Sequence, residues 1–492
     1  MSDHTIAAIS TAVSDAGIGI IRVSGPDAVC IVDRIFADAQ GHHRLAQAPT
    51  HRILHGYILR PGEPSAEVLD EVLVSVMRAP HSYTAEDVVE VNCHGGRFVL
   101  GRVLELILQS GARLAEPGEF TKRAFLNGRI DLSEAEAVME VISAQSDFAL
   151  QNGERQLSGA LSDNVQEIRE VLLHETARIE AALDDPDVYD LTDNAAALTS
   201  ILTDVGSRLE TLLSTAEEGR IRRDGIDTII LGAPNAGKSS LFNRLTDSER
   251  AIVTQIPGTT RDLIEEQVRL GELVLKLIDT AGLRYTTDPV ERIGVERAVA
   301  RARAAQLMIY VVDGERVIGM DGRVSSEGMS AVRSDINEIA DVFLSDRKHL
   351  LLFNKTDLLP GGEASTKAGC DALTAMVQEL SGEPAAQIHV LPVSMNTGEG
   401  LEALKETIAA LFLQGELVPR GEYYLTNLRH VEAVREALSS VQLVLEAIRR
   451  GDSEELYCTD LMAAYHALGR ILGAEPDEDL FDEIFSSFCM GK

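Results

Sequence analysis

Short apolar runs separated by Gly, Pro or Asp dominate the first part of the chain. They are rich in β-branched residues, which is typical of strands in an α+β fold. The runs cover residues 18–23, 70–76 and 87–92. Residues 97–110 instead place apolar side chains at helical spacing and stop at Gly111, which predicts a helix. We therefore expect residues 1–125 to form a small α+β domain.

From Asp131 the pattern becomes helical, with Ala, Glu and Leu recurring at a period near 3.6 residues. Either Asp131 or Ser133 can cap the first of these helices. The pattern covers 131–146, 157–183, 195–216 and 430–492, and it breaks at the Asp-Asp-Pro of 184–186. It predicts a domain of long helices in two parts, 126–220 and 416–492.

Between these parts, over residues 221–415, short buried strands alternate with helices. This alternation favours a parallel sheet flanked by helices, so the chain is predicted to be a multidomain α/β and α protein. The α/β domain is inserted into the helical one. The stretch 314–348 is longer than one helix needs, and we expect an additional acidic surface loop there.

The composition is that of a globular protein, with 45% apolar and 25% charged residues among 492. Lys and Arg number 45 against 78 Asp and Glu, a formal net charge of −33, which argues against a general phosphate-binding surface. RNA contact must then be local or come through a partner. The candidate basic clusters are Lys122, Arg123 and Arg129, and Arg220, Arg222 and Arg223.

The five cysteines form no CxxC pair, which argues against a disulfide framework and for a reducing compartment. The N-terminal MSDHTIAAIS lacks a cationic segment leading into an apolar run. The longest apolar stretches are far shorter than the roughly 20 residues of a membrane span. These features predict a cytoplasmic protein.

A phosphate-binding motif follows the first strand of the central segment. Gly232-Ala-Pro-Asn-Ala-Gly-Lys-Ser-Ser240 matches G-x-x-x-x-G-K-[ST] between a strand and a helical pattern, the context that the motif requires. Its N–H groups can converge on phosphate oxygens, Lys238 can reach the β- and γ-phosphates, and Ser239 can hold Mg²⁺. The alternative is a chance Gly-rich turn, against which the next motifs argue.

Two of these motifs also follow predicted strands. Asp279-Thr-Ala-Gly282 can hold the Mg²⁺ shell through its carboxylate and sense a γ-phosphate through its last N–H. Asn354-Lys-Thr-Asp357 can read guanine, because Asp357 can accept from N1–H and the 2-amino group, an edge that adenine does not present. The Asn354–Asp357 motif therefore favours GTP over ATP.

The segment Thr254-Gln-Ile-Pro-Gly-Thr-Thr-Arg261 can order around Mg²⁺ and the γ-phosphate, with Thr260 as the metal ligand. Ser394-Met-Asn396 occupies the usual purine-supporting loop, although its middle residue is usually Ala. The predicted GTP contacts are Asn235, Ala236, Gly237, Lys238, Ser239, Ser240, Thr254, Gln255, Ile256, Pro257, Gly258, Thr259, Thr260, Asp279, Thr280, Ala281, Gly282, Asn354, Lys355, Asp357, Ser394, Met395 and Asn396.

Leu283 stands where a Ras-like GTPase has the Gln that orients the attacking water. An apolar side chain cannot do this, so another residue must hold the water and another cation must meet the transition-state charge. The side-chain oxygen of Asn235 and backbone carbonyls of 254–259 could together cage a monovalent ion. The alternative is that Asn235 only shapes the loop.

With these motifs, nearly the whole chain resembles the MnmE (TrmE) family of bacterial and organellar tRNA-modification GTPases. The resemblance rests on their order and on matching stretches outside the GTPase set. These are Tyr83–Val88 (YTAEDV), His94–Gly96 (HGG), Gly118–Leu132 (GEFTKRAFLNGRIDL), Glu291–Gly294 (ERIG) and Phe485–Lys492 (FSSFCMGK).

The resemblance implies a homodimer with an N-terminal tetrahydrofolate-binding domain, a helical domain and an inserted Ras-like GTPase domain that hydrolyses GTP across K⁺. It implies an FAD-containing partner, MnmG. The complex would add an aminomethyl or carboxymethylaminomethyl group to C5 of the wobble uridine (position 34) of tRNA, with a 5-formyl- or 5,10-methylene-tetrahydrofolate donor.

Residue roles carried over by motif are also expectations of this resemblance. Arg22, Glu90, Arg129 and Lys492 would contact folate, and Glu291 would position the hydrolytic water, which makes Glu291, Lys238 and Thr260 the catalytic candidates. K⁺ would be held by Asn235, Thr254, Ile256 and Thr259. Cys489 near the folate site has either a chemical role or a packing role.

Three positions depart from the family pattern. Arg129 stands where Lys is common, which keeps the charge, and Gln255 stands where Asp is frequent. The usual Pro-Pro-Gly is replaced by Val13-Ser-Asp-Ala-Gly17, which alters that loop. A regulatory GTPase switch of the ribosome-assembly type is the competing interpretation, because it shares the phosphate-loop motifs and often the Leu283 substitution.

Overall fold

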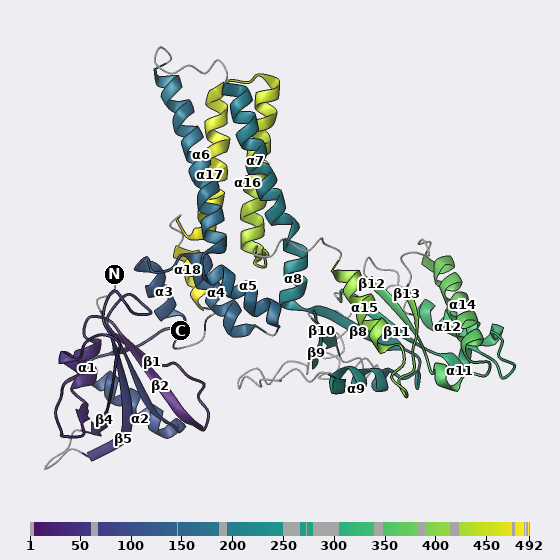
Figure 1. Cartoon of the computed structure of the whole chain (residues 1–492), viewed down its shortest axis with the longest axis horizontal. Coiled ribbons are helices and arrows are strands. Elements are labelled where there is room, and N and C mark those ends of the chain that lie inside the picture. The colour runs from purple at the N-terminus through teal and green to yellow at the C-terminus, as the bar shows by residue number, and fades with distance from the viewer. Residues whose placement is uncertain are drawn as a thin grey trace. The chain divides into compact units, whose positions relative to one another are not determined.

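The computed structural model describes residues 4–60, 67–144, 146–185, 194–248, 266–271, 273–278, 305–338, 348–381, 389–413, 423–474, 478–486, 488 and 491 (Figure 1). The chain separates into two compact units. The first comprises Met1–Ser143, Gly153–Glu210 and Glu432–Lys492, and the second comprises Ala144–Asn152 and Thr211–Val431. The boundaries expected from sequence at 125, 220 and 415 stay predictions.

The first unit contains a seven-stranded sheet of order β3-β4-β5-β6-β2-β1-β7. Its strands pair antiparallel, except that β1 and β7 are parallel. The strands are β1 (Ile6–Ile9), β2 (Ala16–Ser24), β3 (Phe36–Asp38), β4 (Arg52–Arg60), β5 (Glu67–Met77), β6 (Val88–Gly95) and β7 (Arg113–Leu114). The runs at 18–23, 70–76 and 87–92 are confirmed as parts of β2, β5 and β6.

Helices cover one face of this sheet. They are α1 (Ala28–Asp33) and α2 (Arg97–Gln109), with the short helix η1 (Leu45–Gln47), and α2 confirms the helix expected at 97–110. Alternate residues of the strands point into the core beneath α1 and α2, as period-two patterning requires. The opposite face exposes Ile18, Ile53 and Leu73, which are 66%, 67% and 47% accessible. Beside this open face, Phe120 of α3 (Glu119–Leu126) packs against Ile6 and Ala8 of β1.

Long helices form the rest of the first unit, and Figure 1 shows α6, α7, α16 and α17 running together as a bundle. The helices are α4 (Leu132–Ser143), α5 (Asp147–Leu157), α6 (Ala160–Asp184), α7 (Asn194–Ser214), α16 (Leu428–Arg450), α17 (Glu454–Leu472) and α18 (Glu478–Ser486); the ends of α5, α7 and α16 extend into the second unit. Helix α6 ends at the expected break.

Asp131, and not Ser133, caps α4. Its Oδ1 accepts from the Glu134 N–H at 2.8 Å, and its own N–H donates to the Glu134 Oε2 at 2.8 Å, a reciprocal capping box. Ser133 lies inside the helix and is fully buried. Sequence allowed both residues, and the Glu three positions after Asp131 decides between them.

The second unit is built on a six-stranded sheet of order β13-β12-β11-β8-β10-β9, parallel except for β9. Its strands are β8 (Ile226–Gly232), β9 (Glu266–Leu270), β10 (Leu273–Ile278), β11 (Leu307–Asp313), β12 (Lys348–Asn354) and β13 (His389–Pro392). Its helices are α8 (Ala216–Asp224), α9 (Lys238–Ser248), α11 (Gly314–Val317), α12 (Ser326–Glu338), η3 (Thr356–Leu358), α14 (Glu363–Ser381) and α15 (Leu401–Phe412).

Both faces of this sheet are covered. Residues of α9 and α15 share one core with every second residue of β11, and residues of α11, α12 and α14 share the other core with the intervening ones. Figure 1 shows the helices on the two sides of the strands. A mostly parallel sheet buried on both faces, with a phosphate loop after its central strand β8, is the Ras-like fold that the sequence predicted.

The expectation of an acidic loop within 314–348 is wrong for the described part of that stretch. Residues 314–317 and 326–338 are helical, and the connector between them is closed by a bridge from Ile318 to Val324. The connector carries one acidic and one basic side chain, Asp321 and Arg323. The additional residues of this stretch thus form a second helix, α12, and its connector to α11. Within the described residues, no helix combines the length and apolar character needed to cross a membrane.

Candidate functional site

The phosphate-binding loop of the second unit runs from the end of β8 to the start of α9. Gly232 and Gly237 have φ of 141° and 106°, and a Cβ at these positions would lie 2.3 Å from the Val311 oxygen and 2.1 Å from the Asn354 Nδ2. Only glycine fits both places. Asn235 also takes a positive φ of 62°, a region that Asn tolerates better than most residues.

Lys238 is the first residue of α9, where a helix N-terminus favours anions. Its Nζ donates to the carbonyl oxygens of Gly232 and Ala233, at 2.8 Å each. Partial burial lowers the pKa of this ammonium. Ser239 and Ser240, the next two residues, are exposed. The loop therefore holds a cation and a helix end at the position that the motif predicted for phosphate.

Asn354 ties the phosphate loop to the loop that follows β13. Its side chain is 2% accessible, its Nδ2 donates to the Ala236 oxygen at 2.8 Å, and its Oδ1 accepts from the Met395 N–H at 3.0 Å. Met395 places its side chain in the core beside Val393. The departure from Ala at this position is thus accommodated by burial, and the backbone contact is kept.

The carboxylate of Asp357 is held in a fixed orientation by two side chains of the loop after β13. The Ser394 Oγ donates to its Oδ1 at 2.7 Å, and the Asn396 Nδ2 donates to its Oδ2 at 3.1 Å. These hydrogen bonds, that of Ser394 foremost, hold the pKa of the exposed Asp357 carboxyl below its ordinary value. A fixed, ionised carboxylate at the end of β12 is what the predicted reading of guanine needs.

Lys355, between these two residues, adopts a left-handed conformation with φ of 66°. Its Nζ lies 2.7 Å from the Asp313 Oδ2 and 3.1 Å from the Glu315 Oε2, and the bond to Asp313 leads the causes that raise the pKa of this ammonium. Asp313 also caps α11 by accepting from the Glu315 N–H. An ion pair between Asp313 and Lys355 thereby links the ends of β11 and β12.

Sequence reasoning missed Arg244 as a contributor to this site. From α9, its Nε donates to the Met395 oxygen at 3.1 Å and its NH2 to the Asn396 oxygen at 2.7 Å. The side chain therefore holds the loop that supports Asp357. No local motif marks it, because its partners lie some 150 positions away in the chain.

Several predicted residues lie outside the described part of the chain. They comprise Thr254, Gln255, Ile256, Pro257, Gly258, Thr259, Thr260, Asp279, Thr280, Ala281, Gly282, Leu283, Glu291, Cys489 and Lys492. The described GTP-site residues come together from β8, α9, β12 and the loop after β13.

The first unit gathers a second group of predicted residues. Arg22 on β2 and Glu90 on β6 are register partners on the open face of the sheet, with the Arg22 Nε 2.9 Å from the Glu90 Oε1. The Arg22 NH1 also donates to the Gly491 oxygen at 3.4 Å, and the Ser10 Oγ donates to the same oxygen at 3.0 Å. Gly491 of the C-terminal segment therefore lies against Arg22.

Tyr83 joins Arg22 to the third predicted residue, Arg129. The two guanidinium carbons lie 4.9 and 5.1 Å from the centroid of the Tyr83 ring, within cation–π range. The Arg129 NH1 donates to the Tyr83 oxygen at 2.6 Å, and the Tyr83 hydroxyl lies 2.8 Å from that of Thr121. Arg22, Glu90 and Arg129 are thus brought together near the Tyr83 ring. The sequence predicted the first three residues, but not the role of Tyr83 between them.

Comparison with known proteins decides the family. Residues 132–489 match the family model described as the MnmE helical domain, and residues 5–129 match that described as the GTP-binding protein TrmE N-terminus. The tRNA modification GTPase MnmE of Lachnoclostridium phytofermentans is 43% identical over 492 residues, 100% of both chains. That of Geobacillus kaustophilus is 42% identical over 492 residues, 99% of both chains. The chain belongs to the MnmE family of tRNA-modification GTPases.

Membership in the MnmE family makes the chain a GTPase. The fixed Asp357 carboxylate, which suits the donor edge of guanine, and the phosphate loop with Lys238, which suits phosphates, lie at one edge of one sheet.

The structure corrects part of one expectation for this MnmE family member, namely two of the six basic residues offered for RNA. Arg123 is 7% accessible and pairs with Glu86 and Glu119 at 3.1 Å each, and Arg222 is 6% accessible and pairs with Glu218 at 2.6 Å. Because these two buried guanidiniums already hold carboxylates, Arg123 and Arg222 are not available to phosphate in solvent. RNA contact through the other four residues, Lys122, Arg129, Arg220 and Arg223, stays a prediction.

Proposed function

We propose that the chain is the K⁺-stimulated, GTP-hydrolysing subunit of a cytoplasmic tRNA-modifying complex. It adds an aminomethyl or carboxymethylaminomethyl group to C5 of the wobble uridine, position 34, with a tetrahydrofolate one-carbon donor. The carrying observation is the arrangement of Arg22, Glu90, Arg129 and Tyr83 in a member of this GTPase family. A GTPase that acts only as a switch has no use for such a group.

The folate proposal follows from the chemistry of these side chains. Glu90 can accept hydrogen bonds from a pterin edge, and Arg22, Arg129 and Lys492 can pair with carboxylates of the glutamate part. Arg22 is 15% and Glu90 is 22% accessible in the side chain, so both are partly shielded from water. One-carbon chemistry would be supplied by the bound 5-formyl or 5,10-methylene group. Cys489 stays a candidate for a chemical role there.

Nucleotide hydrolysis is assigned to the second unit. Lys238 meets the β- and γ-phosphates, exchanging its two carbonyl contacts for phosphate oxygens, and Ser239 and Thr260 hold Mg²⁺. Glu291 positions the attacking water in place of the Gln that Leu283 replaces. K⁺, held by Asn235, Thr254, Ile256 and Thr259, would supply positive charge to the transition state. The exposed side chain of Asn235 in the phosphate loop supports that ligand.

The first prediction tests the monovalent ion. Replacing K⁺ by Na⁺ at equal ionic strength should lower the rate of GTP turnover at least tenfold, the order of effect expected from loss of one transition-state charge contact. Phosphate release measured in both salts is the readout. Asn235→Ala should remove the difference between the salts, and equal wild-type rates would show that Asn235 only shapes the loop.

A homodimer is proposed from the open face of the seven-stranded sheet. Ile18, Ile53 and Leu73 are exposed on this face, and one-sided sheets commonly bury such a patch against a partner. Arg22 and Glu90 lie on the same face. An FAD-containing MnmG subunit and the tRNA anticodon region are the further proposed partners.

Reconstitution tests the whole proposal. The full chain, the FAD subunit, unmodified tRNA, GTP, methylene-tetrahydrofolate and an amine, ammonium or glycine, should together convert the wobble uridine, read by mass spectrometry of tRNA digests. The folate supplies the methylene carbon, and the amine supplies the nitrogen of the aminomethyl or carboxymethylaminomethyl group. Leaving out folate should abolish the product. A chain that hydrolyses GTP yet neither binds folate nor supports modification would instead be a regulatory switch.

A further inference from the structure

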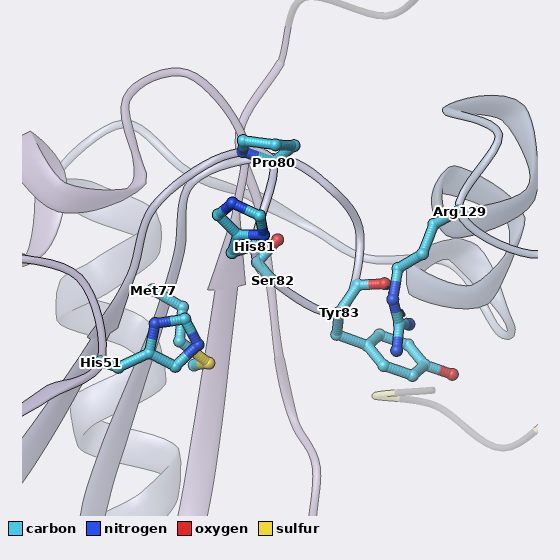
Figure 2. Close-up of a pocket in the computed structure, with 7 residues that line it drawn as sticks. All are labelled: His51, Met77, Pro80, His81, Ser82, Tyr83 and Arg129. Atoms are coloured by element: carbon cyan, nitrogen blue, oxygen red, sulfur yellow. Dashed lines mark hydrogen bonds between the residues drawn. The ribbon is translucent and has the colours of Figure 1, made fainter.

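A pocket of about 480 Å³ opens next to the Arg22 group, and of its lining residues the function proposed above uses only Tyr83 and Arg129. Its walls include His51, Met77, Pro80, His81, Tyr83 and Arg129. Figure 2 shows His51 and Met77 on one side, Tyr83 and Arg129 on the other, and the ring of His81 between them. Its volume lies in the range of small-ligand sites.

The pocket is lined by hydrogen-bond donors and apolar groups. The ionisable or titratable side chains among its described lining residues are Arg129, His51, His81 and Tyr83, and none is a carboxylate. The Tyr83 hydroxyl is turned to Thr121. In a chain with 78 acidic residues and a net charge of −33, a pocket of this kind is suited to an anion.

The two acidic residues that follow Tyr83 most closely in sequence, Glu86 and Asp87, are already engaged. Asp87 accepts from the Arg78 NH1 at 2.9 Å, and Glu86 pairs with Arg123 and accepts from the Ser24 hydroxyl at 2.7 Å. Their charges are thus offset by their own partners. Arg129 donates one hydrogen bond to the Tyr83 carbonyl oxygen at 2.6 Å. Because a guanidinium has five N–H donors, Arg129 can still bind a carboxylate.

The pocket is continuous with the proposed folate site through one side chain. Arg22 and Arg129 both lie against the Tyr83 ring, and Tyr83 and Arg129 form one wall of the pocket. A folate whose pterin is read by Glu90 and whose glutamate reaches Arg129 has its γ-carboxyl at the edge of the pocket. Any extension of the ligand from that carboxyl enters it.

We propose that this pocket binds the poly-γ-glutamyl tail of the folate donor, an inference that rests on the proposed function. Each γ-linked glutamate adds one α-carboxylate and two methylene groups. Arg129, His51 and His81 match the carboxylates, while Met77 and Pro80 offer apolar surface to the methylenes. The pocket selects donors by tail length.

Titration of the full chain with 5-formyltetrahydrofolate carrying one or five glutamates, followed by calorimetry, tests this. The pentaglutamate should bind about tenfold tighter, the gain expected from one or two added charge-assisted hydrogen bonds. The double variant His51→Asn, His81→Ala should bind both forms with the affinity that the wild type shows for the monoglutamate. Asn is chosen at 51 because His51 has a φ of 58°.

His174→Ala is the matched control, since this histidine has a side chain 75% accessible on α6 and does not line the pocket. It should keep the tenfold preference. Equal wild-type affinity for the two forms, or a preference that survives in the double variant, would overturn the tail site while leaving folate binding intact. If the wild type binds neither form, the proposed function itself fails and this inference with it.

Discussion

At the scale of single residues, Asp357 combines exposure with a fixed geometry. Each of its carboxylate oxygens accepts a hydrogen bond from the loop after β13, which both orients the group and stabilises its charge. Its pKa is lowered from an ordinary value of 3.8, so this stabilisation is complete above that value and is lost only as the pH falls through the depressed pKa. Guanine recognition should therefore be insensitive to mild acid.

Asp357→Asn provides the second prediction. Loss of the carboxylate should weaken GTP at least tenfold, because two hydrogen bonds to a charged acceptor are removed. An amide can donate to the 2-oxo group of xanthine, so xanthosine triphosphate should be favoured. Competition binding of the two nucleotides measures both effects. Unchanged selectivity would mean that the base is read elsewhere, and Asp371→Asn on α14 is the control.

The third prediction concerns His94 and Asp70 on the sheet of the first unit. The His94 Nδ1 lies 2.6 Å from the Asp70 Oδ1, and this hydrogen bond raises the pKa of His94. The pair therefore stabilises the fold below the ordinary imidazole pKa of 6.5, and this contribution fades as the pH rises through the raised value.

Asp70→Asn should return the His94 pKa toward 6.5. Two-dimensional NMR titration of the histidine ring signals measures the shift, and Glu105→Gln, which removes the partner of Arg102 on α2, is the control. An unshifted His94 titration in Asp70→Asn would contradict the assignment.

At the scale of elements, Gly491 of the C-terminal segment contacts the N-terminal sheet. Gly491 has a φ of 90°, and a Cβ there would lie 2.4 Å from the Ile9 oxygen. Its carbonyl accepts from Ser10 and Arg22. The close approach of two strands of backbone thus requires glycine at this position.

Gly491→Ala is the fourth prediction, and it should displace the segment from β1. Folate affinity should fall at least fivefold, because Arg22 loses a partner and Lys492 moves with the segment, while GTP affinity stays unchanged. Equilibrium binding of both ligands to the same preparation separates the effects. Gly451→Ala is the control, since it has a similar φ of 73° and no atom within 4 Å of the added Cβ.

Elements with local signatures were predictable, and contacts between distant segments were not. The phosphate loop, Asn354 and Asp357 belong to short motifs that follow strands. These motifs can be recognised in the sequence because binding phosphate and guanine requires particular residue types. Arg244 and Tyr83 act through partners far along the chain. Arg244 lies in none of the motifs, and the stretch YTAEDV that includes Tyr83 does not show which side chains contact its ring. In the sequence, Arg123 and Arg222 stand in basic clusters that are typical of exposed residues. Only the fold shows that each guanidinium lies beside a carboxylate.

At the scale of the whole molecule, the net charge of −33 sets the expected behaviour toward tRNA. The fifth prediction is that the chain alone forms no discrete complex with tRNA at about 1 μM protein and 0.15 M salt, since non-specific affinities in that salt are weak even for basic proteins. Adding the FAD subunit should restore binding. Gel shift at two salt concentrations measures this, and tight, salt-resistant binding by the chain alone would contradict it.

The contact of Gly491 with Ser10 and Arg22 joins positions 481 and 469 residues apart. During synthesis Arg22 leaves the ribosome long before Gly491, so the seven-stranded sheet can fold before this contact forms. A chain truncated before Gly491 should therefore fold its sheet normally and yet leave the Arg22 guanidinium without its backbone partner.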